Sequence, residues 1–278
     1  MDKCINTYFL FNDEFKKCEE FEDYESSIGK SLYEVIRIAD GIPIFLMEHI
    51  ERLENSARIM KYNLDITKDE IINRILKLIY ENNNGDGNLK LVLNDNFLAY
   101  FIPHTYPTIQ QYSEGVKTIT YHGERSNPNA KVINSAFREK VNKEINSKNV
   151  YEAILVDDAG FITEGSRSNI FMVKGDVVLT SKLENVLPGI TRQVIIKICE
   201  KLGIVLDEKN IHESNLESLD GLFISGTSPK VLPIKNVDEF SFNSSKNTII
   251  NSIMNGYEVE LNENKQILLK FIKNRTIN

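Results

Sequence analysis

Four segments between residues 129 and 229 interrupt their local pattern with small, polar or strained residues. They are Asn129-Ala-Lys131, Thr163-Glu-Gly-Ser-Arg-Ser-Asn169, Leu187-Pro-Gly-Ile-Thr-Arg192 and Ser225-Gly-Thr-Ser-Pro229. Lys131 brings a primary amine, although a lysine taken alone is most often a solvated side chain. Glu164 brings a carboxylate, which could keep a pyridine nitrogen protonated or simply cap its own turn.

Two of the segments could bind an anion. Pro188 and Gly189 lead into a predicted helix, so the N–H groups of Gly189, Ile190 and Thr191 could hold a phosphate at its positive end. The alternative is an ordinary proline-initiated helix. The Ser225 segment predicts a strand-end turn whose hydroxyls could accompany a phosphate, or a turn with no ligand.

The elements before these segments predict a first domain built from hairpins and helices. Asp40-Gly41 is a type I′ turn signal, and Thr67-Lys-Asp-Glu70 is a capping-box pattern that opens a helix. The predicted order is strand Ser31–Ala39, strand Ile42–Met47, helix Glu48–Met60, a helix after Thr67, and a hairpin of Leu89–Leu93 with Phe97–Ile102.

A proline-rich stretch without periodicity predicts a linker over residues 105–113, which separates a domain of residues 1–104 from one of 114–278. The second domain is expected to contain mostly short antiparallel strands. Its helices are predicted from about Val132 to Ile145, from Ile190 to Leu202, where Gly203 stops the helix, and twice near the C-terminus.

Taken together, the four segments are similar in order and spacing to the second domain of fold-type IV pyridoxal 5′-phosphate (PLP) enzymes, the class IV aminotransferases. The resemblance covers Leu32 to about Val237, including Tyr33-Glu-Val-Ile-Arg37 and Glu48-His-Ile-Glu-Arg-Leu53. In that family the cofactor lysine lies some twenty residues before a segment like Tyr151-Glu-Ala-Ile-Leu155, and Lys131 lies twenty residues before Tyr151.

The resemblance implies an α+β fold with a small N-terminal α/β domain and a larger C-terminal domain of mostly antiparallel strands. It implies that Lys131 is the catalytic residue and forms a Schiff base with PLP. It also implies that Glu164 contacts the pyridine nitrogen and that Arg52 contacts the phosphate. It also places Leu187 under the cofactor ring. The remaining phosphate contacts are assigned to Gly189, Ile190, Thr191, Gly226 and Thr227.

The implied reaction is ping-pong transfer of an amino group between a branched-chain-like amino acid and a 2-oxo acid such as 2-oxoglutarate. An incoming amine displaces Lys131, and the freed amine moves a proton between the substrate Cα and the cofactor. The implied assembly is a homodimer. The expected partners are therefore small molecules and a second copy of the chain.

The group that binds the substrate carboxylate is not evident. Branched-chain transaminases have a tyrosine five residues after the lysine, where this chain has Ala136, and Asn94-Asp-Asn-Phe97 lacks the arginine and histidine of D-amino-acid transaminases. The arginine of the branched-chain group is replaced by Val92. The cations in the sequence that could bind the substrate carboxylate instead are Arg167, Arg37 and Lys90. Tyr33 matches a pocket-wall tyrosine of the D-amino-acid group.

Two alternatives are open. Aminodeoxychorismate lyase, which releases pyruvate and 4-aminobenzoate, uses the same fold and lysine, but its strand-end turn usually lacks the Gly226-Thr227 pair. The other alternative is a PLP-binding protein without turnover, which the joint presence of Lys131, Glu164 and Arg52 disfavours.

The composition restricts the partners. With 41% hydrophobic residues and a net charge of −7, the chain is predicted to be an ordinary globular protein with no nucleic-acid partner. No apolar run predicts a signal peptide or a membrane span, and the four histidines show no metal spacing. The three cysteines form no CxxC pair, so reduced thiols in a cytoplasmic protein are expected.

Overall fold

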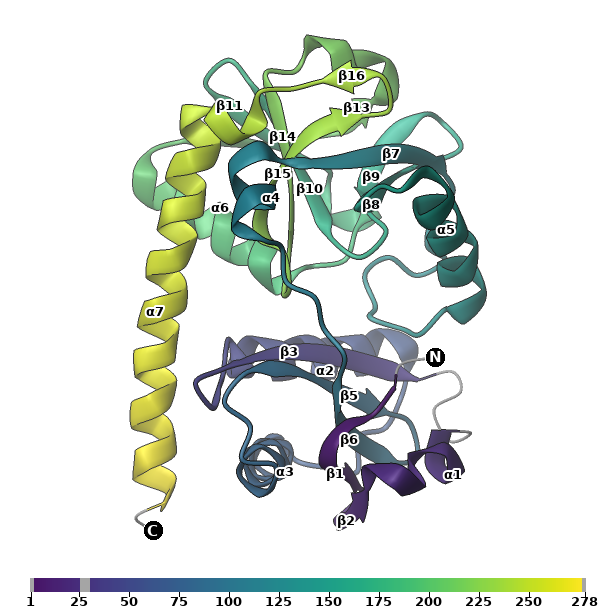
Figure 1. Cartoon of the computed structure of the whole chain (residues 1–278), viewed down its shortest axis with the longest axis vertical. Coiled ribbons are helices and arrows are strands. Elements are labelled where there is room, and N and C mark those ends of the chain that lie inside the picture. Colours follow the sequence, from purple (N-terminus) through teal and green to yellow (C-terminus); the bar gives the residue numbers. More distant parts are fainter. Residues whose placement is uncertain (1–2, 26–30, 277–278) are drawn as a thin grey trace. The chain divides into compact units, whose positions relative to one another are not determined.

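The computed structural model describes residues 3–25 and 31–276, and its chain groups into two compact units (Figure 1). Unit 1 contains Met1–Thr105, Ala130–Ile133 and Leu261–Asn278, and unit 2 contains Tyr106–Asn129 and Asn134–Glu260. Both units combine helices with a sheet, which confirms the predicted α+β fold class.

Unit 1 is built on a six-stranded antiparallel sheet with the strand order β2-β1-β6-β5-β3-β4. Its strands are β1 (Ile5–Phe11), β2 (Glu14–Lys17), β3 (Leu32–Ala39), β4 (Ile42–Pro43), β5 (Gly87–Leu93) and β6 (Phe97–Ile102). Its helices are η1 (Cys18–Glu20), α1 (Phe21–Glu25), α2 (Leu46–Met60) and α3 (Lys68–Glu81). Along β3, burial alternates with the period of two that a strand requires, so Glu34 shares the buried face with Leu32 and Ile36.

Unit 2 is built on a larger sheet with the order β12-β11-β10-β14-β15-β7-β8-β9-β13, and β16 pairs with β15. The pairs β11/β12, β15/β7 and β7/β8 are parallel, whereas the others are antiparallel. The strands are β7 (Val116–His122), β8 (Glu152–Val156), β9 (Phe161–Gly165), β10 (Asn169–Lys174), β11 (Val177–Thr180), β12 (Val205–Glu208), β13 (Ile211–His212), β14 (Gly221–Gly226), β15 (Lys230–Val237) and β16 (Phe240–Ser241).

The helices of unit 2 are α4 (Ile109–Glu114), α5 (Ser135–Lys148), η3 (Leu183–Asn185), α6 (Ile190–Leu202), η4 (Glu213–Ser218) and η5 (Ser244–Lys246). The long helix α7 (Thr248–Thr276) contributes its residues up to Glu260 to this unit. The core is aliphatic and comes from alternating strand positions such as Ile154, Ile170 and Ile224. This core holds the strand ends and the start of α6, which carry the candidate residues of this unit.

Local signals predicted most elements correctly. Thr67 forms the capping box with Glu70, and Gly203 ends α6 in a left-handed conformation with φ of 66°. Asp40 and Gly41 both have positive φ, as a type I′ turn requires. β6 and α6 have the predicted bounds.

Three predicted elements were wrong. The strand expected to reach Met47 ends at Pro43, because Phe45 turns the chain at φ of 53° and α2 begins at Leu46. The linker contains α4, which Thr108 and Gln111 cap. The two helices expected near the C-terminus form a single helix, α7. In α7, Gly256 permits a close approach to Ile198, because a Cβ added to Gly256 would lie 2.7 Å from the Cγ2 atom of Ile198.

The expectation that all cysteines remain reduced thiols was also wrong. Cys4 and Cys18 form a disulfide, with Cα atoms 5.8 Å apart. The two residues come together because β1 and β2 form a hairpin that the sequence patterns did not predict. Cys199 is a buried free thiol.

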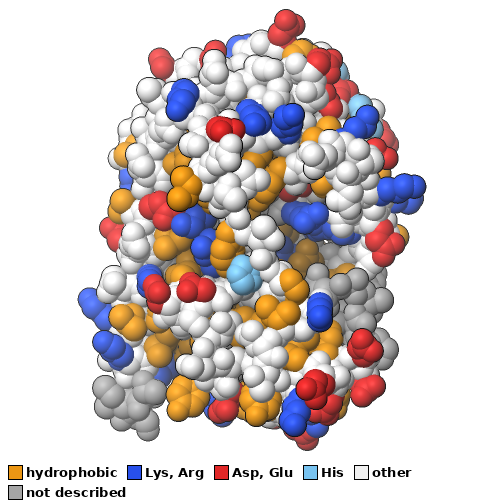
Figure 2. Space-filling view, in the orientation of Figure 1, with side chains coloured by type: hydrophobic (Ala, Val, Ile, Leu, Met, Phe, Trp, Pro, Cys, Tyr) orange, Lys and Arg blue, Asp and Glu red, His pale blue; other side chains and the backbone are white. Residues whose placement is uncertain are grey.

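Charged side chains of both signs are interspersed over the face shown in Figure 2. No helix in the described part of the chain has both the length and the apolar character that crossing a membrane would require.

Candidate active site

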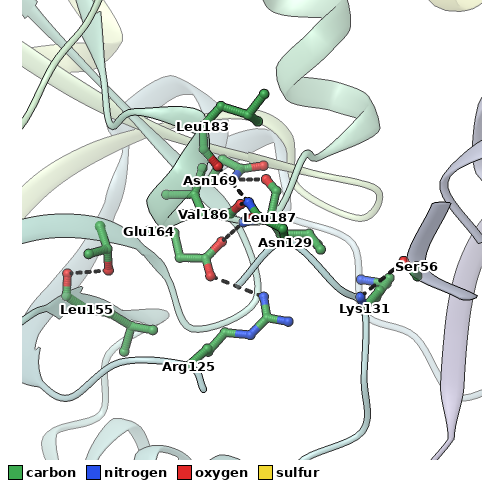
Figure 3. Close-up of polar contacts among 11 residues, drawn as sticks. Ser56, Arg125, Asn129, Lys131, Leu155, Glu164, Asn169, Leu183, Val186 and Leu187 are labelled. Carbon is green, nitrogen blue, oxygen red and sulfur yellow. Dashed lines mark hydrogen bonds and ion pairs between the residues drawn. The ribbon is translucent and has the colours of Figure 1, made fainter. Parts of the chain in front are cut away.

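Lys131 belongs to unit 1, where its short segment lies beside β3 and not in a helix. Its carbonyl oxygen accepts a hydrogen bond of 3.0 Å from the Tyr33 N–H, and its own N–H donates to Ser56 Oγ at 3.3 Å (Figure 3). Helix α5 begins only at Ser135, later than predicted. Because the main chain of Lys131 is bonded on both sides, the direction of its Cα–Cβ bond is fixed.

The Lys131 side chain points to an aromatic ring that a second lysine shares. Lys131 Nζ lies 4.6 Å from the centroid of the Tyr33 ring, and Lys90 Nζ lies 5.4 Å from the same centroid. Lys90 is 8% exposed and also lies 5.9 Å from the ring of Tyr100, its partner across β5 and β6. The aromatic faces attract these ammonium groups and help to keep a buried charge in place.

Arg52 lies on α2 in a buried ionic group with Glu34 and His49. Its Nε donates to Glu34 Oε1 at 2.8 Å and its Nη2 to Oε2 at 2.7 Å, while His49 Nδ1 lies 2.7 Å from Oε2. Burial would raise the pKa of the Glu34 carboxyl, but the charge and hydrogen bonds of Arg52, with help from His49, hold it well below its usual range.

The imidazole of His49 is affected in the opposite way. Burial lowers the pKa of His49, the hydrogen bond and charge of Glu34 raise it, and the charges of Arg52 and Lys131 lower it further; the net shift is downward. His49 is therefore neutral at pH 7. The sequence patterns did not single out Glu34 or His49, because their contacts depend on how α2 packs on β3.

In unit 2, Glu164 is the last residue but one of β9 and is almost fully buried. Its Oε2 accepts a hydrogen bond of 3.0 Å from the Leu187 N–H, and its Oε1 accepts one of 3.1 Å from Arg125 Nη1 (Figure 3). Sequence reasoning missed Arg125, and the available signal was a cation in the polar loop before Lys131.

Leu187 and the start of α6 are held by Asn169. The Asn169 Nδ2 donates to the Leu187 carbonyl at 2.9 Å, so both polar atoms of the Leu187 main chain are bonded. Gly189 is the N-cap of α6 and contributes no side-chain hydrogen bond, while Ile190 and Thr191 are buried in the first turn. Because the N-cap residue is a glycine, no N-cap side chain accepts a hydrogen bond from the first main-chain N–H groups of α6.

The strand-end turn that contains Gly226 and Thr227 follows β14 in the same unit. Ser225, the residue before it, is 1% exposed, and its Oγ has no hydrogen-bond partner among the described residues. Ser225 pairs with Asn169 across β14 and β10, which places it on the strand next to the residue that holds Leu187. A buried hydroxyl without a partner is costly in the free protein.

The candidate residues therefore fall into two groups. Unit 1 brings together Tyr33 and Lys131 and holds Arg52 on α2. Unit 2 brings together Glu164 and Leu187 at the start of α6. Arg167 is not part of this cluster, because its exposed side chain donates to Asn142 Oδ1 at 2.7 Å.

Comparison with known proteins identifies the family. Residues 31–237 match the class IV aminotransferase family, and the chain belongs to this family. It is 31% identical to a putative branched-chain-amino-acid aminotransferase of Methanocaldococcus jannaschii, over 78% of this chain and 81% of that protein. It is 30% identical to a D-alanine aminotransferase of Bacillus licheniformis, over 82% and 88% of the two chains.

Solved structures show the same fold. The branched-chain amino acid aminotransferase of Escherichia coli superposes with a TM-score of 0.82 and 25% identity, over 92% of this chain and 95% of that one. A putative 4-amino-4-deoxychorismate lyase from Legionella pneumophila has a TM-score of 0.76 at 19% identity, over 84% and 92%. The protein is thus a fold-type IV transaminase, and its family implies a PLP cofactor.

Proposed function

We propose that this enzyme transfers the amino group of a branched-chain amino acid to a 2-oxo acid such as 2-oxoglutarate, in two ping-pong half-reactions. Its similarity to two branched-chain transaminases supports this substrate class. The observation that carries the proposal is the placement of Lys131, whose main chain is bonded to Tyr33 and Ser56 while its Nζ lies against the Tyr33 ring.

The residues present fit PLP. Among the residues that the structure describes, Ser225 Oγ is a buried hydroxyl without a hydrogen-bond partner. The N-cap of α6 has no side-chain hydrogen bond, so unit 2 offers donors for a phosphate. Glu34 accepts hydrogen bonds from the Nε and Nη2 atoms of Arg52, which fix the guanidinium that the family resemblance assigns to the phosphate. PLP bound to Lys131 supplies an electron sink that weakens the bonds at the substrate Cα.

The residues of the chain then have separate tasks. Lys131 binds the cofactor and, once released as a free amine, moves a proton at the substrate Cα. Glu164 holds a proton on the pyridine nitrogen, and Arg125 and the Leu187 N–H keep its carboxylate in position. Gly189, Ile190, Thr191, Gly226 and Thr227 bind the phosphate through the α6 N-terminus and the strand-end turn.

Lys90 is the best candidate for the cation that binds the substrate carboxylate. It shares the Tyr33 ring with Lys131, whereas the exposed side chain of Arg167 is engaged with Asn142. Lys90→Met should raise KM for both substrates by about tenfold to a hundredfold, because a charged hydrogen bond is worth roughly 1.5–3 kcal/mol. Arg167→Gln is the control and should leave KM unchanged; the opposite pattern would transfer the role to Arg167.

The reaction is tested by loading the purified protein with PLP and following oxo-acid formation from Leu, Ile, Val and D-Ala with 2-oxoglutarate as the acceptor. We expect turnover of the branched-chain substrates, and no turnover or lysine-bound chromophore in Lys131→Ala. Preference for D-Ala would refute the branched-chain assignment. Release of pyruvate and 4-aminobenzoate from aminodeoxychorismate without an oxo-acid acceptor would instead identify a lyase.

We also propose a cytoplasmic homodimer, as the family resemblance favours. Light scattering of the PLP-loaded enzyme should give twice the mass of the 31.9 kDa chain. A monomer with full activity would refute the dimer.

A further inference from the structure

A second buried carboxylate lies in unit 2, outside the set of candidate site residues. Glu152 is the first residue of β8 and is 3% exposed. Ser166 Oγ donates to its Oε1, Ser168 Oγ donates to its Oε2 at 3.3 Å, and the Ala153 N–H donates to Oε1 at 3.2 Å. Within the described part of the chain, no lysine, arginine or histidine forms an ion pair with it. A buried carboxylate held by neutral donors alone is unusual and calls for an explanation.

The donors of Glu152 all belong to one short loop or to the strand beside it. Ser166 and Ser168 lie between β9 and β10, and the Ser166 N–H also donates to the Ala153 carbonyl at 2.9 Å. The loop is tightly folded, because a Cβ added to Gly165 would collide with Ser168 Oγ. Glu152 therefore fixes both halves of the loop to the start of β8.

The two residues that flank this loop are those that hold Leu187. Glu164 precedes the loop and accepts from the Leu187 N–H, while Asn169 follows it and donates to the Leu187 carbonyl (Figure 3). Leu187 is joined through Pro188 to the N-cap of α6. A shift of the loop would thus move the Glu164 carboxylate and the helix N-terminus together.

We propose that Glu152 is a positioning residue of the transamination site. Its carboxylate anchors Ser166 and Ser168, and the anchored loop keeps Glu164 and Asn169 in register on the two sides of the Leu187 main chain. This inference rests on the proposed function, because it concerns how Glu164 is held for its cofactor. Small displacements of such groups reduce rates strongly, since reacting groups must be aligned closely.

The first measurement needs no cofactor. The Glu152→Gln substitution keeps the size of the side chain and removes its charge. Hydrogen exchange of the cofactor-free variant is then followed by mass spectrometry and compared with that of the wild-type protein. We expect exchange to become about tenfold faster in segments 164–169 and 187–190, with the rest of unit 2 unchanged. Glu217→Gln on η4 is the matched control, since Glu217 is exposed.

The second measurement uses the PLP-loaded enzyme. We expect Glu152→Gln to weaken PLP binding and to lower kcat by about tenfold or more, with KM for the amino acid nearly unchanged, because the substrate contacts proposed for Lys90 belong to unit 1. Should Glu152→Gln not fold, Ser166→Ala and Ser168→Ala keep the carboxylate, remove one donor each, and should show the same local change.

The outcomes separate the two hypotheses. Faster exchange throughout unit 2 would show that Glu152 only stabilises the unit, and unchanged exchange and kcat would show that it has no role; either result overturns the inference. Failure of the wild-type protein to bind PLP would instead refute the proposed function.

Discussion

Glu34→Gln is the substitution whose effect on stability follows most directly from the structure. Glu34 is fully buried and receives two hydrogen bonds from Arg52 and one from His49. The amide has the same size, so no cavity forms, but the guanidinium of Arg52 remains buried without its counter-charge. Removing one partner of a buried ion pair typically destabilises a protein by about 3–5 kcal/mol.

That loss is a large part of the roughly 5–15 kcal/mol by which most native proteins are stable. Urea unfolding followed by far-ultraviolet circular dichroism is suitable, because the chain has no tryptophan. With a denaturant slope of about 2 kcal/mol per molar, the unfolding midpoint should fall by about 2 M.

The matched control is Glu51→Gln on α2, the helix that carries Arg52. Glu51 pairs with Lys68 at 3.3 Å, but its side chain is 65% exposed, so the expected change is only about 0–1 kcal/mol. Equal effects of the two substitutions would refute the reasoning, because they would mean that Arg52 does not depend on Glu34 for its counter-charge.

Three further predictions concern other parts of the chain. Because burial lowers the pKa of His49, the unfolded chain takes up a proton below about pH 6.5 while the folded chain does not. Stability should therefore fall as the pH drops below that value, by at most about 1.4 kcal/mol per pH unit, and His49→Gln should remove this slope in urea titrations. Gly189→Ala should destabilise unit 2 by about 1–3 kcal/mol and weaken PLP binding, because the new Cβ collides with Asn169 Oδ1; Gly85→Ala, with open space around it, should be neutral. Reduction of the Cys4–Cys18 disulfide should lower the free energy of unfolding by about 3 kcal/mol, and a reductant should not affect the Cys4→Ser, Cys18→Ser double variant.

Whether a structural feature could be predicted from the sequence depended on how far apart its residues lie along the chain. The Thr67 capping box and the Gly203 helix end use residues a few positions apart, so local patterns identified both correctly. The family resemblance predicted the fold, which the structure and the relatives confirm. The roles of Lys131 and Glu164 stay predictions.

The supporting residues of the site could not be predicted from local patterns. Arg125 and Glu164 are 39 positions apart, and Arg52 is 18 positions from Glu34. Their pairing follows from strand register and from the packing of α2 on the sheet, which no short pattern encodes. The same limit explains why the sequence patterns did not single out Glu152, although it is the buried partner of two serines.

The discontinuous make-up of unit 1 has a consequence for the order in which the protein is made. Its last segment, Leu261–Asn278, is synthesised after the whole of unit 2. That segment supplies Asn264, which accepts from the Phe45 N–H at 2.8 Å, and the cations Lys265 and Arg275, which pair with Asp40 and Asp69. On the ribosome, the N-terminal third therefore emerges first but completes its contacts last, and a chain stopped just before Leu261 should leave unit 1 the less stable and more protease-sensitive of the two.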